Sequence, residues 1–204
     1  CRNALDPDWI SGGSSSGSAV GVALGLATFS LGTDTAGSGR VPAMLNNIVG
    51  LKPSLGLLSS RGVVPACRTL DTVSVLALTV DDTFKVLSAC AGHDEADPWS
   101  RDRPVYRPSA LAPTFRVGVP DSSSIEFCGD KAQALAFERD LEALGKRGAE
   151  IIQMDFEPLY RVARLLYEGT WVAERHSVVA ELLSNAPDTI HPTTQTVING
   201  ALKF

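Results

Sequence analysis

Two short serine-bearing segments contain the residue types that acyl-transfer chemistry requires. Residues 12–18 read Gly-Gly-Ser-Ser-Ser-Gly-Ser, and residues 32–40 read Gly-Thr-Asp-Thr-Ala-Gly-Ser-Gly-Arg. Nucleophilic acyl transfer needs an activated hydroxyl, a group that moves its proton, and N–H donors where an oxyanion forms. Ser14, or a neighbouring serine, and Ser38 are the candidate hydroxyls, and 24 residues separate these two.

The turn around Ser38 consists of small residues and has a glycine on each side of the serine. Such a turn can curl so that successive amides face one point, forming a nest for a tetrahedral intermediate. Asp34 and Arg40 flank the turn, and we predict that they form an ion pair that braces it rather than taking part in the chemistry. The expected oxyanion donors are the four amides of Thr35, Ala36, Gly37 and Ser38.

Two other interpretations of the Gly/Ser-rich stretch are weaker. A flexible linker explains its beginning, but a linker does not continue into the apolar, helix-sized residues 19–26 and the strand-like residues 28–31. A phosphate-binding loop would also use glycines before a helix, but neither G-x-x-x-x-G-K-[ST] nor G-x-G-x-x-G is present. A buried helix and a strand between the two segments can instead bring the serines together.

The rest of the chain predicts an α/β protein. Residues 115–120 and 149–154 are expected strands, with a helix over 131–146 between them, which is the βαβ pattern of a parallel or mixed sheet. A capped helix of about three turns follows Thr79 and stops at Gly92.

The sequence also predicts a loop and a helical region in two further segments. The Pro- and Asp-rich residues 94–114 are expected to form a long surface loop. Residues 158–183 predict one or two helices. Their candidate buried positions are Val162, Leu165, Leu166, Trp171 and Val172.

Composition excludes several classes of partner. With 18 basic and 23 acidic side chains, the net charge of −5 provides no basic surface for nucleic acid or an anionic membrane. The longest weakly polar run, residues 18–31, carries no charge but is too short to span a bilayer. The cysteines are widely spaced, which indicates neither a zinc site nor a disulfide framework and fits a cytoplasmic protein: Cys1, Cys67, Cys90 and Cys128.

The serine segments resemble the signature of the amidase signature family. Residues 12–18, then G-T-D-T-A-G-S-G-R-V-P-A, then Gly-Leu-Lys-Pro at residues 50–53 follow the family's order and spacing. The resemblance implies an α/β fold, with a mixed β-sheet core covered by helices on both faces, and a Ser-Ser-Lys triad that uses no metal or organic cofactor. Ser38 matches the acyl-forming nucleophile, and Ser14 matches the bridging serine, which in the family follows a cis peptide bond.

The resemblance also makes residues 1–204 part of a single amidase domain. In the family, the catalytic lysine lies well before the Gly/Ser-rich segment, whereas the lysines here all follow Ser38: Lys52, Lys85, Lys131, Lys146 and Lys203. We therefore expect the chain to lack the N-terminal catalytic-lysine segment and the C-terminal part, so that the fold is incomplete. The isolated chain is predicted to be inactive, because two serines supply no base of suitable pKa.

Within the family, several stretches are similar to the allophanate hydrolases. The clearest is Leu-Leu-Tyr-Glu-Gly-Thr-Trp-Val-Ala-Glu-Arg at residues 165–175, in which Tyr167 and Arg175 match residues that hold the substrate. Allophanate is a small urea with a carboxylate, which suits a guanidinium fork. On a continuous helix, these two side chains would lie on one face about two turns apart.

The expected activity is hydrolysis of allophanate, a small-molecule amide, to ammonia and carbon dioxide. The alternatives are another enzyme of the family, such as the glutaminase subunit of a tRNA amidotransferase, and a non-catalytic relative that keeps the scaffold for binding. The partner arrangements that the resemblance leaves open are a homodimer and a urea carboxylase that is fused to the chain or acts with it.

Plainer interpretations of individual residues also remain open. Arg175 is consistent with an ordinary surface arginine, and Tyr167 with a core side chain whose hydroxyl meets water. The pattern favours structural bracing over catalysis for Arg68 and Asp71. Cys67 fits a small buried hydrophobic residue better than a nucleophile.

Overall fold

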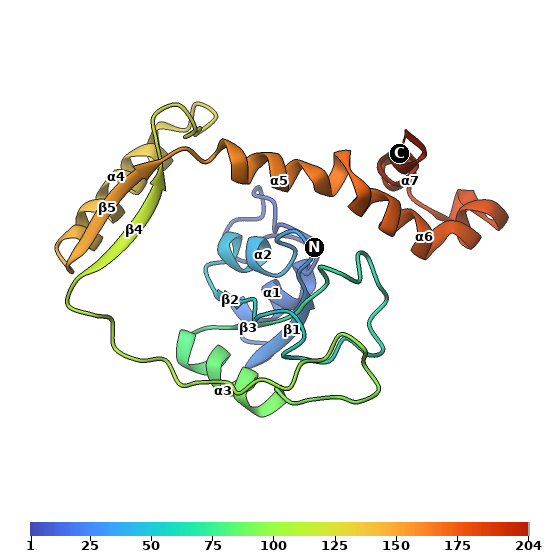
Figure 1. Ribbon diagram of the computed structural model, residues 1–204, viewed down its shortest axis with the longest axis horizontal. Helices are drawn as coiled ribbons and strands as arrows, with labels where there is room; N and C mark the ends of the chain where they lie inside the picture. Colours follow the sequence, from blue (N-terminus) through green and yellow to red (C-terminus); the bar gives the residue numbers. More distant parts are fainter. Residues whose placement is uncertain (204) are drawn as a thin grey trace. The chain divides into compact units, whose positions relative to one another are not determined.

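The computed structural model describes residues 1–203, which fall into two units, each with its own β-sheet (Figure 1). The first unit contains residues 1–105 and the segment that begins at Thr170, and the second contains residues 106–169. Antiparallel pairing occurs in the first unit and parallel pairing in the second. The α/β class predicted from the sequence is confirmed.

The sheet of the first unit has β3 (Val73–Ala77) at its centre, between β1 (Phe29–Thr33) and β2 (Val49–Leu51). Both outer strands run antiparallel to β3, and Val75 is the partner of a leucine in each of them. β3 is almost entirely buried. Its side chains are apolar except for that of Ser74, which fits a strand covered on both faces.

Helices cover both faces of this sheet (Figure 1). Leu76 of β3 belongs to a buried cluster with residues from α1 (Ser16–Ala23) and α2 (Arg40–Leu45). Its neighbour Val75 belongs to a second cluster, with Leu87 from α3 (Val80–Cys90). Successive side chains of a strand point to opposite faces, so α1 and α2 lie on one side and α3 on the other. The expected helical cover is present.

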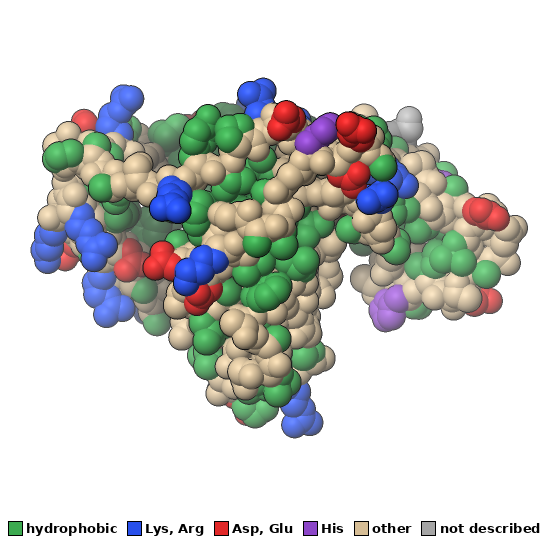
Figure 2. Space-filling view, turned by 90° about the horizontal axis from the view of Figure 1, so that it is seen from below, with side chains coloured by type: hydrophobic (Ala, Val, Ile, Leu, Met, Phe, Trp, Pro, Cys, Tyr) green, Lys and Arg blue, Asp and Glu red, His purple; other side chains and the backbone are tan. Residues whose placement is uncertain are grey.

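The first helix starts and ends earlier than predicted. The sequence indicates a buried helix over residues 19–26, whereas α1 ends at Ala23, and Leu24 and Leu26 are 56% and 79% exposed. Gly25 turns the chain there with a φ of +72°. Apolar side chains are visible over much of the face drawn in Figure 2. Apolar character alone therefore overestimates burial in this segment.

The helix predicted after Thr79 is confirmed as α3. The Thr79 hydroxyl accepts a hydrogen bond from the Asp82 N–H at 3.1 Å, which caps the helix. Residues 94–114 contain no helix or strand, as expected. Their beginning is nevertheless anchored, because the buried Asp97 accepts hydrogen bonds from the Ser60 N–H at 2.7 Å and the Trp99 N–H at 2.9 Å. The other residues of this first part are exposed or half-buried, so the expected surface loop is confirmed, with Asp97 as its buried anchor.

The βαβ pattern in the second unit is confirmed. β4 (Phe115–Pro120) and β5 (Ala149–Met154) pair in parallel, with α4 (Lys131–Gly145) as the connection. The Asp130 side chain caps α4 by accepting from the Gln133 N–H at 3.0 Å. α5 (Glu157–Glu168) follows β5 and ends the unit.

The helical region after residue 157 is interrupted at Gly169. This residue is extended, with φ −149° and ψ −162°, and α6 (Thr170–Asn185) begins directly after it. α7 (Pro192–Asn199) and two short 3₁₀ helices (Pro187–Thr189 and Gly200–Lys203) complete the first unit. Among residues 1–203, no helix combines the length and apolar character needed to cross a membrane.

The burial predicted for this region is only partly correct. Val172 of α6 is fully buried, whereas Val162 and Leu165 are 54% and 44% exposed. Both exposed residues lie on α5, which has no extensive contact with the other helices and strands of its unit. An apolar stripe at helical spacing identifies a face suited to packing, but not the element that covers it.

Candidate active site

A backbone hydrogen bond joins the two serine-bearing segments. The N–H of Ser15, at the start of α1, donates to the carbonyl oxygen of Ser38 at 3.1 Å. The Ser15 hydroxyl also donates to the Thr33 carbonyl at 3.4 Å, at the end of β1. The structure thus brings the residue after Ser14 into direct contact with Ser38, and the peptide bond between Gly13 and Ser14 is cis.

A close approach to Gly32 allows this contact. A Cβ atom at Gly32 would lie only 2.4 Å from the Ser15 Oγ and 3.3 Å from a methyl group of Leu76. A side chain at this position in β1 would therefore push away the start of α1. Packing therefore requires glycine at position 32. Only a residue without a side chain lets α1, which carries the first serines, approach the strand that leads to Ser38.

The carboxylate of Asp34 organises the turn that carries Ser38. It accepts hydrogen bonds from the N–H groups of Gly37 at 2.8 Å, Gly39 at 3.3 Å and Arg40 at 3.1 Å. Arg40 also binds it through Nε at 2.8 Å and Nη2 at 3.0 Å. Gly37 has a φ of +115°, which lets the chain curl around the carboxylate. Asp34 and Arg40 thus form the ion pair expected from their positions.

This geometry corrects the predicted oxyanion donors. The Gly37 N–H is already engaged by the Asp34 carboxylate, so it is not available to a substrate oxygen. Among the described residues, the N–H groups of Thr35, Ala36 and Ser38 donate to no other atom. These three amides remain the candidate donors of the turn.

Charge and burial set the protonation state of Asp34. Burial raises the pKa of this carboxyl, but the hydrogen bonds from Arg40 and Gly37 outweigh burial and lower the pKa from 3.8 to about 2. The side chain has no solvent exposure. Asp34 is therefore ionised at neutral pH and holds the turn as an anion.

We expect Asp34→Asn to destabilise the protein that contains this chain by about 2–3 kcal/mol at pH 7, because several charge-assisted hydrogen bonds are lost. Since the folded pKa lies below the usual 3.8, the stabilisation is present above about pH 4 and disappears as the pH falls toward 2. Urea unfolding of both proteins at several pH values measures this difference, with the exposed Asp102→Asn as the matched control. A difference that stays constant from pH 7 to pH 2 would contradict the role of the charge.

Two asparagines that the sequence analysis missed fasten the segment before the first serines to the end of α2. The buried Asn46 donates through Nδ2 to the carbonyls of Ser11 at 3.0 Å and Pro42 at 2.9 Å, and its Oδ1 accepts from the Ala4 N–H at 2.9 Å. Asn3 donates to the Leu45 carbonyl at 2.7 Å. An asparagine beside an apolar segment is too common to reveal such contacts from sequence.

Asp71 connects the serine turn to residues 66–71. Its carboxylate accepts from the Thr35 hydroxyl at 2.5 Å, and from the N–H groups of Ala66 at 2.8 Å and Cys67 at 3.1 Å. The Asp34 N–H donates to the Thr72 carbonyl at 2.8 Å beside this contact. These bonds fit the structural role favoured for Asp71 from the sequence.

Cys67 is buried and has a protonated thiol. Burial, followed by a hydrogen bond from Sγ to the Glu174 carboxylate at 3.0 Å, raises the pKa of this thiol to about 11. A thiol with such a pKa is a poor nucleophile at neutral pH. This environment agrees with the prediction that Cys67 is not the reactive group.

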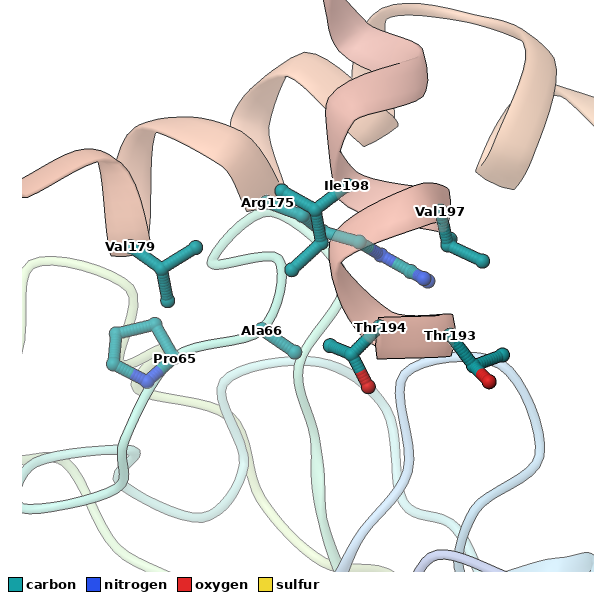
Figure 3. A pocket seen from close by; sticks show the side chains of 8 residues that line it. All are labelled: Pro65, Ala66, Arg175, Val179, Thr193, Thr194, Val197 and Ile198. Carbon is teal, nitrogen blue, oxygen red and sulfur yellow. The ribbon is translucent and has the colours of Figure 1, made fainter. Parts of the chain in front are cut away.

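Arg175 contributes to a pocket in the first unit. The pocket has a volume of about 390 Å³ and lies between α6, α7 and the loop at residues 65–66. Figure 3 shows the Arg175 side chain reaching from α6 toward α7 within this group of residues. Apolar groups and two threonines form the remaining wall: Pro65, Ala66, Val179, Thr193, Thr194, Val197 and Ile198. The pocket can take a small ligand beside a guanidinium group.

Tyr167 does not share a helix with Arg175. Tyr167 lies on α5 in the second unit, with 54% of its surface exposed, whereas Arg175 lies on α6 in the first unit. The extended conformation of Gly169 separates the two helices. Residues 158–183 thus form two helices, and the condition under which Tyr167 and Arg175 would share one face, a continuous helix, is not met.

Comparison with known proteins identifies the family. The family model described as Amidase matches residues 1–202, so the chain belongs to the amidase family. It is 42% identical to the urea amidolyase of Saccharomyces cerevisiae, over 98% of this chain and 11% of that protein. It is 40% identical to a glutamyl-tRNA(Gln) amidotransferase subunit from Pelobacter propionicus, over 76% of this chain and 32% of the relative.

A solved structure also relates this chain to the amidase family. Kluyveromyces lactis allophanate hydrolase superimposes with a TM-score of 0.92 at 40% identity, and the match covers 100% of this chain and 34% of that one. The amidase signature fold expected from the sequence is thereby confirmed. The chain spans about a tenth of the length of the yeast urea amidolyase and about a third of the solved allophanate hydrolase.

Proposed function

We propose that the protein containing this chain hydrolyses allophanate through an acyl-enzyme. The observation that carries the proposal is the contact between the two serine segments, made by the Ser15 N–H and the Ser38 carbonyl in a chain of the amidase family. Two hydroxyl-bearing turns held together in this way supply a nucleophile with a neighbouring hydroxyl that can transfer its proton. The match to a solved allophanate hydrolase over the whole chain supports the choice of substrate.

In the proposed mechanism, the Ser38 hydroxyl attacks the carbonyl of the terminal amide. Its proton passes through Ser14 to a lysine from a part of the protein outside residues 1–204. The amides of Thr35, Ala36 and Ser38 stabilise the oxyanion, and one such donor is typically worth about 3–4 kcal/mol. Ammonia leaves with the returned proton, and water then hydrolyses the acyl-enzyme. Complete breakdown of one allophanate yields two molecules of ammonia and two of carbon dioxide.

Arg175 is the proposed partner of the substrate carboxylate. Its position in a pocket of about 390 Å³ supports this role, because the pocket is large enough for a molecule the size of allophanate. A guanidinium group matches a carboxylate with two parallel hydrogen bonds. Tyr167 is proposed as a second substrate-binding residue, supported by its place in the stretch that resembles allophanate hydrolases.

The proposed substrate also implies a partner. Carboxylation of urea forms allophanate, so we propose that a urea carboxylase is fused to this protein or acts together with it. The 42% identity to urea amidolyase over almost the whole chain supports the same reaction sequence. The similarity to the amidotransferase favours a second candidate, hydrolysis of glutamine, but it extends over only 76% of the chain.

A substrate panel tests the proposal. We expect the purified full-length protein to release ammonia from allophanate with a kcat/KM at least tenfold above that for biuret or glutamine, because only allophanate offers a carboxylate beside a urea-type amide. Released ammonia is measured in an enzyme-coupled assay. Preferred hydrolysis of glutamine would instead support the amidotransferase candidate, and binding of allophanate without turnover would support the non-catalytic relative.

A further inference from the structure

We propose that Glu174 is a positioning residue that holds the Ser38 turn in its reactive geometry through residues 66–71. This inference rests on the proposed function, since it takes Ser38 as the nucleophile. Glu174 lies on α6, and its side-chain hydrogen bonds go to Cys67 and Thr69 rather than to the serine turn. Its effect passes through two carboxylate contacts in succession, one made by Glu174 and the other by Asp71.

The first contact fastens α6 to the loop. The Glu174 carboxylate accepts from the Thr69 N–H at 2.9 Å, from the Thr69 hydroxyl at 2.7 Å and from the Cys67 thiol at 3.0 Å. Burial raises the pKa of Glu174, but these hydrogen bonds outweigh burial and lower it overall, so the group is an anion at neutral pH. Three hydrogen bonds to one anion fix the loop against α6 more firmly than an apolar contact would.

The second contact fastens the same loop to the serine turn. Asp71 accepts from the Ala66 and Cys67 N–H groups, which closes residues 66–71 into a tight loop. The same carboxylate accepts from the Thr35 hydroxyl, and Thr35 lies in the turn of Ser38. A loop closed by its own hydrogen bonds moves as one body, so a displacement at Thr69 is transmitted to Thr35.

The hydrogen bonds of Glu174 have a second consequence, because Glu174 is next to Arg175 in the sequence. Adjacent residues of an α-helix point about 100° apart, so Glu174 faces the loop while its neighbour faces the pocket. Pro65 and Ala66, at the start of the same loop, line that pocket together with Arg175. Glu174 therefore sets the spacing between the proposed carboxylate anchor and the proposed nucleophile.

The central experiment measures Glu174→Gln in the full-length protein. We expect Glu174→Gln to slow phosphonylation of Ser38 by a fluorophosphonate between about 10- and 100-fold, because small displacements of reacting groups have effects of this size. It also lowers kcat for allophanate more than it changes KM. The exposed Glu181→Gln, on the same helix, is the matched control.

A second pair of variants keeps the test valid if Glu174→Gln folds poorly. Thr35→Val removes the hydroxyl that binds Asp71 and slows phosphonylation of Ser38, whereas Thr35→Ser keeps the hydroxyl and restores the rate. In the double variant Glu174→Gln/Thr35→Val, the two losses do not multiply, because both break the same connection. Thermal unfolding of every variant separates rate effects from lost folded protein.

The outcomes distinguish this inference from the proposed function. A wild-type protein in which Ser38 takes up no label would refute the proposed nucleophile. Labelling of wild type and Glu174→Gln at the same rate would refute the positioning role alone, whether or not KM rises. Lower stability of Glu174→Gln with an unchanged rate for the folded protein would reduce Glu174 to an anchor of α6.

Discussion

Ser38→Ala in the full-length protein is expected to abolish covalent labelling by a fluorophosphonate and to lower kcat for allophanate at least about 10⁴-fold. Removing the nucleophile of a serine hydrolase leaves only the contribution of binding and oxyanion stabilisation, and losses of this size or larger result. Ser38 lies in a turn organised by Asp34 and Arg40, so alanine changes the reactive atom and leaves the scaffold in place. Mass spectrometry of the intact protein and of its peptides measures the label.

Cys67→Ala provides the control for this experiment. The Cys67 thiol is buried and its pKa is raised to about 11, so the variant is expected to take up the label on Ser38 to the same final extent as wild type. Label that persists in Ser38→Ala would show that another residue is the nucleophile. Label lost in Cys67→Ala would give the thiol a part in the chemistry that its environment does not predict.

Arg175→Lys is expected to reduce kcat/KM for allophanate by well over tenfold. An ammonium group cannot reproduce the two parallel hydrogen bonds that a guanidinium makes to a carboxylate, and losing such a charged pair typically costs about 2–5 kcal/mol. Malonamate keeps the carboxylate and is expected to lose rate as well. Biuret is neutral and is expected to lose much less. Ammonia release from the three compounds measures the effect.

The neutral substrate distinguishes recognition from a structural role. Equal losses on allophanate, malonamate and biuret would mean that Arg175 maintains the pocket between α6 and α7 rather than pairing with the substrate. The substrate assignment would then become an unspecified amide. An unchanged rate on all three compounds would remove Arg175 from the site altogether.

The elements that the sequence predicts best are those with local signals. β4, α4 and β5 occur where the strand patterns and the helical pattern of residues 131–146 indicate them. β3 was not predicted, although it is the centre of the first sheet, because Val73–Ala77 is a short, mostly apolar segment that includes Ser74, and such a segment suits a strand or a buried helix equally. The sequence left open whether residues 158–183 form one helix or two, because glycine can continue a helix at modest cost.

In the candidate site, local contacts were predictable and distant ones were not. The ion pair of Asp34 with Arg40 follows from their positions on either side of one turn. The bonds from Glu174 to Thr69 join residues 105 positions apart and leave no periodic pattern in the sequence. The sequence also did not reveal that the Gly37 N–H, one of the four expected oxyanion donors, donates to the nearby Asp34 carboxylate.

These chain separations also determine the order in which the site assembles during folding. The contacts of Asp34 with Arg40 span six residues, whereas that of Glu174 with Thr69 spans 105. The entropic cost of loop closure grows with the logarithm of loop length, which makes the second closure about 2.5 kcal/mol more costly than the first. We therefore expect the Ser38 turn to form early, from near neighbours, and α6 to dock late. We also expect partial unfolding to release α6 first, so that the proposed carboxylate anchor is lost while the turn of the proposed nucleophile is still intact.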